Sequence, residues 1–280
     1  MSDEKKYYLG PAGWSYPDWK EIVYPKGMKG HALNFLEKYF NMVEINTTFY
    51  QLPRIPMVEN WCKVLTRDDF QFVLKLGQKF THVRDEITAE DIKGYQNVFK
   101  AVKYHERLGG VLIQFPWSFI NIGENNEYLK KLLEWFAEFP LIVEVRHVGW
   151  HKRSFFEFLN KKNVGFCNID QPEAVNSIKL TDYVTSDIGY LRFHGRNSKE
   201  WFSKNTDRDM RYNYLYNEEE IKQLVEKIKS IHEKGLKIFV VGNNHFKGQA
   251  VVNLLQIASL LFDSKVAFPE SLAKYYSIEQ

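Results

Sequence analysis

Three ionisable residues inside apolar runs point most directly to chemistry. Glu44 and Glu144 lie in short apolar runs, and Lys75 lies within the apolar segment 72–76. A charged group is costly to bury without a partner, so these residues are candidates for general acid–base chemistry. Burial can also lower the pKa of an amine, which would let Lys75 act as a Schiff-base nucleophile. The commoner arrangement for such a lysine is an ion pair with a carboxylate.

Two further polar residues follow apolar runs in the same way. Arg146 comes directly after the run that contains Glu144, and His194 comes after residues 189–193. A histidine titrates near neutral pH and can serve as a general acid or base. We therefore predict a catalytic set, which consists of Glu44, Lys75, Glu144, Arg146 and His194. Ion pairs among such residues could equally be purely architectural.

The segments 194–196 and 242–248 combine glycine, asparagine and basic residues. Gly195 and Gly248 would let backbone N–H groups approach an anion, and the helix after Gly248 would direct its positive dipole end there. Arg196 and Lys247 add positive charge. We predict a site for phosphate or another anion at this place. The alternative is that the two asparagines only cap the last helix.

Aromatic residues cluster in the presumed loops, where they could stack on bases or sugars or pack the loops onto the barrel rim. Together with polar residues at the ends of the apolar runs, they give a set of predicted substrate contacts. This set consists of Trp14, Tyr16, Asn46, Tyr50, Gln114, His147, Arg192, Arg196, Asn243, Asn244 and Lys247.

A metal site has weaker support in the sequence. A mixed carboxylate and imidazole set would suit Zn²⁺ or Mn²⁺, and its candidates are Glu44, Glu144, Asp170, His147 and His194. No HxH or HExxH motif is present, and Cys62 and Cys167 form no paired motif. We assign no metal ligand and leave the cofactor open. The GxSxG motif of a nucleophile-elbow hydrolase is also absent.

The elements that must position these residues alternate between strands and helices. Short apolar runs predict eight strands, at residues 7–10, 42–46, 70–76, 110–115, 141–145, 164–169, 189–193 and 237–241. Helical spacing is found at residues 30–39, from Pro56 to Leu65, and at 89–107, 126–136, 152–159, 218–233 and 248–262. Segment 172–187 has no clear pattern.

Strict alternation predicts a parallel sheet, and eight units match a single (β/α)8 TIM barrel over residues 1–280. A doubly wound open sheet is the alternative, although GxGxxG and GxxxxGK[ST] are absent. In a barrel, functional groups lie at the carboxyl ends of the strands, where the polar residues above occur. Segment 196–216 is long for a plain connection and is expected to be a lid or a binding loop.

The composition excludes several classes of protein. The chain has 280 residues, of which 44% are hydrophobic, and a formal net charge of +3. This apolar content excludes a disordered chain, and the charge is too small to argue for nucleic acid by itself. No apolar stretch is long enough to span a membrane, and the first ten residues lack the apolar segment of a signal peptide. We expect a cytoplasmic protein with no membrane partner.

Several motifs together resemble the YecE-like family, also known as domain of unknown function number seventy-two. They are Gly13-Trp14-Ser15-Tyr16 with Trp19, residues 43–50 and 72–75, Gln114-Phe115-Pro116, Glu144-Val145-Arg146-His147 with Trp150, Arg192-Phe193-His194-Gly195-Arg196, Tyr212-Asn213-Tyr214, and Asn243-Asn244-His245 with Gly248, Ala250 and Asn253. The resemblance implies a TIM barrel and supplies no activity. Gly242 departs from the pattern, because an aromatic residue is expected there.

Three functions remain open on the sequence alone. The leading hypothesis is an enzyme that acts on a phosphorylated or nucleic-acid-like substrate, by hydrolysis or lyase chemistry at a phosphate-bearing sugar. The second is a non-catalytic module that binds single-stranded nucleic acid through loop aromatics and basic residues. The third is a metal-dependent sugar isomerase or epimerase. The partners implied are a phosphate-containing small molecule or a nucleic acid.

Overall fold

Eight parallel strands form one sheet that curves into a nearly closed barrel. The computed structural model describes residues 6–201 and 208–279. Hydrogen-bonded neighbours follow the order β1-β8-β7-β6-β5-β4-β3-β2, which confirms the TIM barrel and excludes an open, doubly wound sheet. The strands are β1 (Lys6–Pro11), β2 (Met42–Ile45), β3 (Gln71–Lys75), β4 (Leu108–Gln114), β5 (Leu141–Glu144), β6 (Gly165–Asp170), β7 (Ile188–Phe193) and β8 (Lys237–Gly242).

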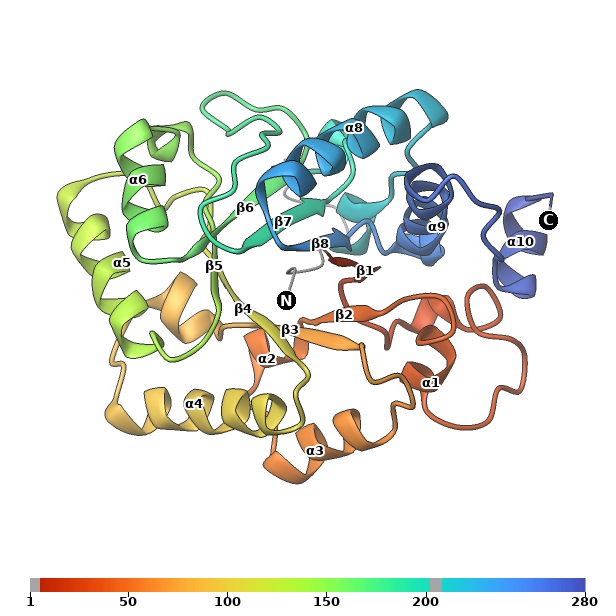
Figure 1. Ribbon diagram of the computed structural model, residues 1–280, viewed down its shortest axis with the longest axis horizontal. Coiled ribbons are helices and arrows are strands. Elements are labelled where there is room, and N and C mark those ends of the chain that lie inside the picture. Colours follow the sequence, from red (N-terminus) through yellow and green to blue (C-terminus); the bar gives the residue numbers. More distant parts are fainter. Residues whose placement is uncertain (1–5, 202–207, 280) are drawn as a thin grey trace.

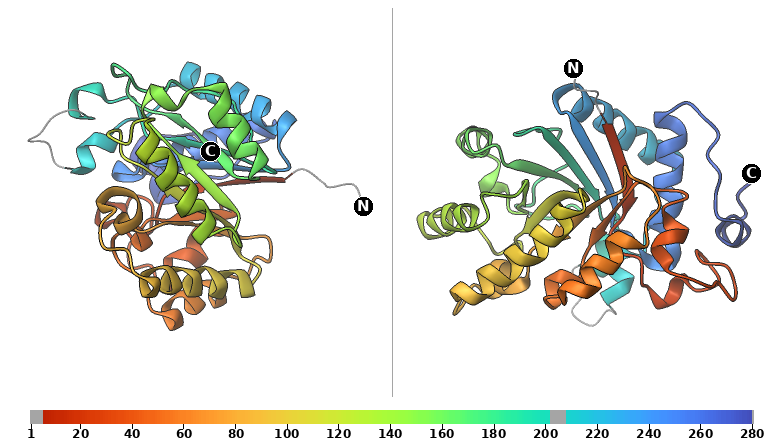
Figure 2. Two further views of the ribbon diagram at one scale, coloured as in Figure 1. Left: turned by 90° about the vertical axis from the view of Figure 1, so that its left-hand side faces the viewer. Right: turned by 60° about the horizontal axis from the view of Figure 1, so that its bottom comes forward.

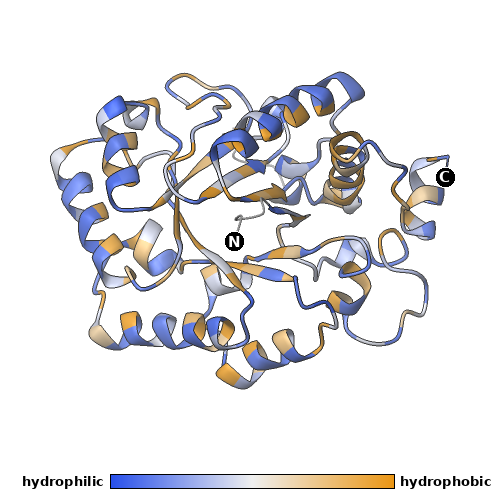
Figure 3. Ribbon diagram, in the orientation of Figure 1, coloured by the Kyte–Doolittle hydropathy of each residue, from blue (hydrophilic) through white to orange (hydrophobic). Residues whose placement is uncertain are grey.

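Helices surround the strands on the outside, as Figures 1 and 2 show. They are α1 (Ala32–Leu36), α2 (Thr47–Tyr50), α3 (Ile55–Lys63), α4 (Ala89–Tyr104), α5 (Gly123–Trp135), α6 (Arg153–Lys161), α7 (Ser198–Trp201), α8 (Glu218–Lys234), α9 (Gln249–Leu261) and α10 (Glu270–Tyr276). Their apolar faces pack on the strands to form the larger of two cores. Their polar faces point outward (Figure 3).

Local sequence signals fix the ends of the two longest helices. At the start of α4, the Thr88 side chain accepts a hydrogen bond from the backbone of Asp91, and the Asp91 carboxylate accepts one from the backbone of Thr88. Asn217 and Glu220 form the same reciprocal capping box at the start of α8. Each box satisfies backbone N–H groups that the first helical turn leaves without partners.

The barrel interior holds the second core, and its chemistry changes along the strands. Side chains alternate between the two faces of a strand, so residues two apart point to the same side. Apolar interior residues include Met42, Val73, Leu112, Ile142, Tyr190 and Val241. Two positions further along the chain come, in that order, Glu44, Lys75, Gln114, Glu144 and Arg192, and, just after the end of β8, Asn243. The barrel interior is therefore apolar in its middle and polar at the carboxyl ends of the strands.

The seam between β1 and β2 closes the barrel without a full ladder. A single parallel bridge joins Ala12 to Glu44. The Asn41 side chain adds two hydrogen bonds, accepting one from the backbone N–H of Leu9 at 2.9 Å and donating one to the carbonyl of Tyr7 at 2.8 Å. A Cβ atom on Gly10 would lie 1.8 Å from the carbonyl oxygen of Met42, so only glycine permits this approach.

The predicted elements agree with the structure in kind and differ at three places. Segment 172–187 contains no helix or strand, so the connection from β6 to β7 lacks the helix of a regular unit. The chain also has α2 and α10, which the periodicity did not indicate. Segment 196–216 holds α7 and a short 3-10 helix at Arg208–Tyr212, while residues 202–207 lie outside the described part. The predicted lid stays a prediction.

The last helix covers the loop after β8. The Tyr276 hydroxyl of α10 donates a hydrogen bond to the carbonyl of Lys247 at 3.0 Å, and Ser271 donates to the carbonyl of Val23 at 3.1 Å. None of the helices in the described ranges is both long and apolar enough to cross a membrane.

Candidate functional site

A cavity of about 440 Å³ opens at the carboxyl ends of the strands. Every strand except β6 contributes to its wall, either through its last interior residue or through the loop that follows it. The lining residues are Gly13, Trp14, Ser15, Tyr16, Asn46, Thr47, Tyr50, Met57, Trp61, Lys75, Gln114, Arg146, Arg192, Asp209, Tyr212, Asn243 and His245. This is the end of a TIM barrel at which functional groups are expected.

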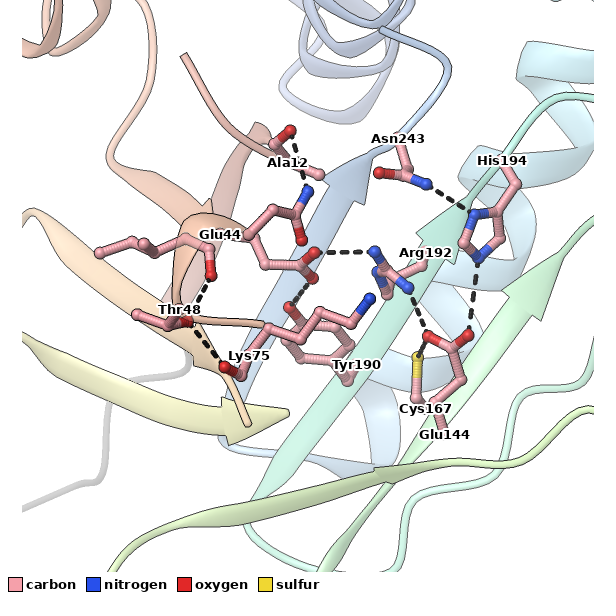
Figure 4. A network of polar contacts seen from close by, with 12 residues as sticks. Ala12, Glu44, Thr48, Lys75, Glu144, Cys167, Tyr190, Arg192, His194 and Asn243 are labelled. Carbon is pink, nitrogen blue, oxygen red and sulfur yellow. Dashed lines mark hydrogen bonds and ion pairs between the residues drawn. The ribbon is translucent and has the colours of Figure 1, made fainter. Parts of the chain in front are cut away.

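The floor of the cavity is a buried network centred on Arg192. Its Nη2 atom donates to Glu44 Oε1 at 2.7 Å, and its Nη1 atom donates to Glu144 Oε2 at 2.5 Å (Figure 4). The Tyr190 hydroxyl donates to Glu44 Oε2 at 2.9 Å, and burial followed by the nearby Glu44 charge raises the pKa of Tyr190. One guanidinium therefore links two carboxylates that are both fully buried.

Arg146 holds the second oxygen of Glu144. Its Nε and Nη2 atoms donate to Glu144 Oε1 at 3.0 and 2.9 Å, and its side chain keeps 17% of its surface exposed to the cavity. Burial by itself raises the pKa of Glu144, but Arg192 and Arg146 outweigh that effect and hold the pKa well below its ordinary value. Glu144 is therefore an anion near neutral pH, and it serves to hold the two arginines.

His194 lies behind Arg192 and is fully buried. Its Nδ1 atom is 2.8 Å from the amide nitrogen of Asn243, which can only donate, so the ring hydrogen is on Nε2. That Nε2 atom lies 3.8 Å from Glu144 Oε1 and has no hydrogen-bond partner among the described residues. Burial and then the nearby arginines lower the pKa of His194 well below its ordinary value. The imidazole is neutral.

Lys75 is the cationic residue of the site that lacks an ion pair. Its Nζ atom lies 3.9 Å from the centre of the Phe49 ring and makes no ion pair with any described carboxylate. Burial and then the Arg192 charge lower the pKa of Lys75 to about 7. His82 packs edge-on against the same ring, and burial followed by Lys75 lowers its pKa to about 4. About half of the amine is therefore uncharged at pH 7.

Aromatic rings form one wall of the cavity. The backbone turns at Gly13, whose φ of +96° suits glycine, and the Tyr16 hydroxyl then donates back to the carbonyl of Ala12. The Tyr16 ring stacks on His245 with a centroid distance of 4.2 Å, and the Tyr212 ring lies 4.9 Å from the same imidazole. Burial raises the pKa of Tyr16 far above its ordinary value, so it remains a neutral donor.

Most of the predicted site residues come together in the structure. Lining the cavity are Trp14, Tyr16, Asn46, Tyr50, Lys75, Gln114, Arg146, Arg192 and Asn243. Glu44, Glu144 and His194 lie directly behind them in the buried network. The functional roles assigned to these residues remain predictions.

Four predicted contacts are not brought to the cavity. The His147 ring accepts from the backbone of Gly149 at 3.0 Å and packs on Trp117. The other three are Arg196, Asn244 and Lys247. Arg196 binds two carboxylates on the far side of β7, and Asn244 is fully buried against Asn253.

The glycine N–H groups of the predicted anion loops have partners within the protein. Gly195 donates to the Tyr216 hydroxyl at 3.0 Å, and Gly248 donates to the carbonyl of His245 at 3.0 Å. The backbone N–H of Lys247 donates to the Asp18 carboxylate at 2.6 Å. These contacts tie the two loops to the barrel rather than leaving their N–H groups for an anion.

Sequence reasoning missed several residues of the site. Tyr190 binds Glu44, and the Cys167 thiol lies 3.7 Å from Glu144 Oε2. Tyr190 could have been found, because it lies two positions before Arg192 and so points to the same face of β7. Trp61 reaches the cavity from a helix, where no strand alternation indicates direction. Tyr212 and His245 stand in the sequence motifs named above but were not included in the predicted site, and both line the cavity.

The carboxylates do not form a metal site of the kind considered. Within the described residues, no three His, Cys, Asp or Glu side chains converge as metal ligands. Arg192 itself lies between Glu44 and Glu144, with a nitrogen on each, in the place where a shared cation would have to bind. His147 and Asp170 lie away from the cavity wall.

Comparisons with known proteins give the same fold and no activity. The UPF0759 protein YunF of Bacillus subtilis is 28% identical over 268 residues, covering 91% of this chain and 94% of that protein. The UPF0759 protein YecE of Escherichia coli is 36% identical over 145 residues, about half of each chain. These relatives carry no function in their names.

Solved structures agree with the barrel. A DUF72 family protein of Thermotoga maritima has a TM-score of 0.82 and 34% identity, covering 91% of this chain and 99% of that chain. A DUF72 family protein of Enterococcus faecalis has a TM-score of 0.82 and 26% identity, covering 92% and 96%. The family described as "Protein of unknown function DUF72" matches residues 8–274. Since this match spans nearly the whole chain, the protein belongs to the DUF72 family.

Proposed function

We propose that this protein is an enzyme that binds a small phosphate-bearing substrate in the barrel cavity and acts on it by acid–base chemistry. The main support for the proposal is a set of basic side chains on the cavity wall. Some of their nitrogen atoms have no hydrogen-bond partner among the described residues. Arg192 Nε is buried without a partner among the described residues, and Arg146 Nη1 and Lys75 Nζ make no hydrogen bond to them. Buried donors without partners are costly, so a ligand rich in oxygen is the expected occupant.

The basic donors on the wall, rather than the net charge around it, favour an anionic group on that ligand. Three basic residues, Lys75, Arg146 and Arg192, line the cavity. Asp209 is the one carboxylate among the described lining residues, and it lies 3.9 Å from His245. Glu44 and Glu144 neutralise the arginines from behind and hold their orientation. Arg146 Nη1 and the Lys75 amine are the donors that this arrangement leaves for a phosphate oxygen.

The size and aromatic wall of the cavity favour a small molecule over a nucleic-acid strand. A volume of about 440 Å³ falls within the range typical of small-molecule sites, roughly 300–1,000 Å³. Tyr16 and Tyr212 present ring surface to the cavity, which suits the face of a sugar or a base. Hydrolysis or lyase chemistry at a phosphate-bearing sugar is the reaction class we favour.

Lys75 is the group best placed to move a proton at neutral pH. Its pKa of about 7 matches the working range of a general base. Glu144 has a lowered pKa and is engaged by two arginines, while His194 is buried behind the wall and accepts a hydrogen bond from Asn243. In this proposal the carboxylates position the arginines, and Lys75 acts on the substrate.

The test is a thermal-shift panel of sugar phosphates and nucleoside monophosphates, each measured beside its dephosphorylated counterpart. A ligand at a hundred times its Kd should stabilise the protein by about 2.7 kcal/mol, which raises the Tm by several degrees. If no phosphorylated compound raises the Tm more than its counterpart does, the proposal fails.

A matched pair of variants assigns the binding to the cavity. Arg146→Gln should weaken binding of the best ligand by about tenfold to a hundredfold, since a charge-assisted hydrogen bond is lost. Arg146→Lys should retain part of the affinity, because it keeps the charge. The control is Arg153→Gln on α6. The Arg153 side chain is 93% exposed, so this substitution should leave the ligand affinity unchanged.

A further inference from the structure

The amine of Lys75 lacks the ion pair that a lysine in an apolar strand normally forms. Two carboxylates are close enough to influence it, but both are already committed to other donors. Glu44 accepts from Arg192 and Tyr190, and Glu144 accepts from Arg192 and Arg146. Figure 4 shows the amine beside this network, with no contact drawn to it. The network therefore leaves Lys75 as a donor and nucleophile without a partner.

The backbone of Lys75 is held firmly although its amine is not. The Thr48 hydroxyl donates to the carbonyl of Lys75 at 2.6 Å, and the Tyr95 hydroxyl donates to the carbonyl of Thr48 at 2.7 Å. These contacts fix the end of β3 against α2 and α4. The amine therefore projects into the cavity from a rigid base, which is what a reaction at Nζ requires.

We propose that Lys75 forms a Schiff base with the carbonyl carbon of an aldehyde or ketone substrate. This inference rests on the proposed function, because a phosphate held by Arg146 would place the carbonyl group of the same molecule at Nζ. The ligand class is thus a small phosphorylated aldehyde or ketone.

The covalent step balances with the Lys75 amine, the substrate carbonyl group and water. The lone pair of the uncharged Nζ attacks the carbonyl carbon, the C–N bond forms, and the C=O π electrons move to oxygen. After proton transfer from nitrogen to oxygen the product is a carbinolamine. Protonation of its hydroxyl by solvent then releases water and leaves a protonated imine, with one C=N bond to Lys75.

The surroundings suit both the reactant and the product of that step. A pKa near 7 leaves about half of the amine uncharged at neutral pH, so the nucleophile is present. The protonated imine is a cation, and it would lie over the Phe49 ring face at the position that Nζ holds now. The negative charges of Glu44 and Glu144 nearby partly offset the burial and the Arg192 charge that disfavour a cation there.

The test is reductive trapping on the whole protein at pH 7. Glyceraldehyde 3-phosphate, dihydroxyacetone phosphate and glyceraldehyde are each incubated with sodium cyanoborohydride, which adds hydride to the imine carbon. Peptide mass mapping then gives the rate of adduct formation at each lysine. A free lysine with an ordinary pKa near 10.4 is almost fully protonated at pH 7, so Lys75 should be modified at least about tenfold faster than exposed lysines.

Variants assign the adduct to its residue. Lys75→Arg should remove the fast-forming adduct, and Lys63→Arg on the exposed face of α3 should leave it unchanged. Because the wild-type map already reports each lysine separately, the test does not depend on the folding of Lys75→Arg. Trapping at Lys75 no faster than at Lys63 would overturn the inference.

A comparison of the phosphorylated with the unphosphorylated aldehyde separates this inference from the proposed function. Faster trapping with glyceraldehyde 3-phosphate than with glyceraldehyde supports both the Schiff base and phosphate recognition. Fast trapping at Lys75 that is equal for the two compounds supports the Schiff base and overturns phosphate recognition. A phosphorylated ligand that raises the Tm while no fast adduct forms on Lys75 overturns the Schiff base and leaves phosphate recognition standing.

Discussion

Two clusters in this protein place an arginine between two carboxylates. They differ in whether every guanidinium nitrogen of that arginine has a hydrogen-bond partner. The barrel network, which consists of Glu44, Arg192 and Glu144, lies under the cavity and leaves Arg192 Nε without a partner among the described residues. The second, the rim cluster, consists of Asp170, Arg196 and Glu220.

In the rim cluster every guanidinium nitrogen has a carboxylate partner. Arg196 Nε and Nη2 donate to Asp170 at 3.0 Å each, and Nη1 donates to Glu220 at 3.1 Å. The Tyr216 hydroxyl donates to Asp170 at 2.5 Å and accepts from the backbone of Gly195 at 3.0 Å. These contacts join the end of β7 to the start of α8, so the rim cluster stabilises the fold.

A buried charge pair therefore does not by itself indicate a functional site. Both clusters look alike in the sequence, since each combines an arginine of the β7 region with acidic residues. A site is indicated instead by donors that remain unpaired beside a cavity. That criterion selects Arg192, Arg146 and Lys75, and it sets Arg196 apart.

The largest expected effect is the loss of stability in Arg192→Met. Removal of the guanidinium leaves two fully buried carboxylates without their common partner, which should cost about 3–5 kcal/mol at pH 7. Urea denaturation measures the loss. Because the carboxylates can take up protons, the destabilisation should shrink at pH 5. A loss below about 1 kcal/mol at pH 7 would contradict the role of Arg192 as the centre of the network.

The next effect is the acid dependence of stability, tested with Glu144→Gln. The folded pKa of Glu144 lies below its ordinary value, so its contribution is present above the unfolded pKa and is lost as the pH falls through the folded value. The wild type should therefore lose on the order of 2 kcal/mol more than the variant between pH 6 and pH 2. Urea denaturation measures the free energy of unfolding of both proteins at each pH. If the two pH profiles run parallel, Glu144 does not contribute to the acid dependence of stability.

Arg196→Gln should break the rim cluster without touching the cavity. Its side chain is 30% exposed, so the loss of stability should be only about 1–2 kcal/mol. Binding of the best phosphorylated ligand, measured by calorimetry, should not change. Weaker ligand binding in this variant would restore Arg196 as a substrate contact and remove the distinction between the clusters.

The smallest effect sharpens the chemistry of Lys75. Phe49→Leu removes the ring face over the amine, which destabilises the charged form and lowers the pKa of Lys75 further. A contribution of about 1 kcal/mol from the ring would raise the uncharged fraction at pH 6 about threefold to fivefold. Labelling of Lys75 by formaldehyde and cyanoborohydride at pH 6 should accelerate accordingly. An unchanged rate would mean that the ring does not influence the amine.

The sequence predicted the strands and the polar residues at their ends because both depend on local patterns. An apolar run such as 189–193 indicates a strand that is buried on both faces. Parallel strands place their carboxyl ends on one side of the barrel. This is enough to gather Glu44, Lys75, Glu144 and Arg192. The segment after β6 carries no periodicity, so the sequence assigned no element to it, and the structure has neither helix nor strand there.

Partners across the barrel were not predictable, since they join residues far apart in the chain. Glu44 and Tyr190 are separated by 146 positions, and Glu44 and Arg192 by 148. The sequence offered several carboxylates for each arginine and no means to choose among them. For the same reason it could not show that Arg146 faces the cavity while Arg196 binds the rim cluster.

Residue type and alternation are properties of the chain, and they are enough to predict an eight-stranded barrel with charged and polar side chains at one end. Which charges pair with one another depends on the closed barrel. Arg192, Arg146 and Tyr190 bind the oxygens of Glu44 and Glu144, so Lys75 receives no carboxylate partner among the described residues. Pairing depends on distances between strands, and those distances exist only once the barrel has closed.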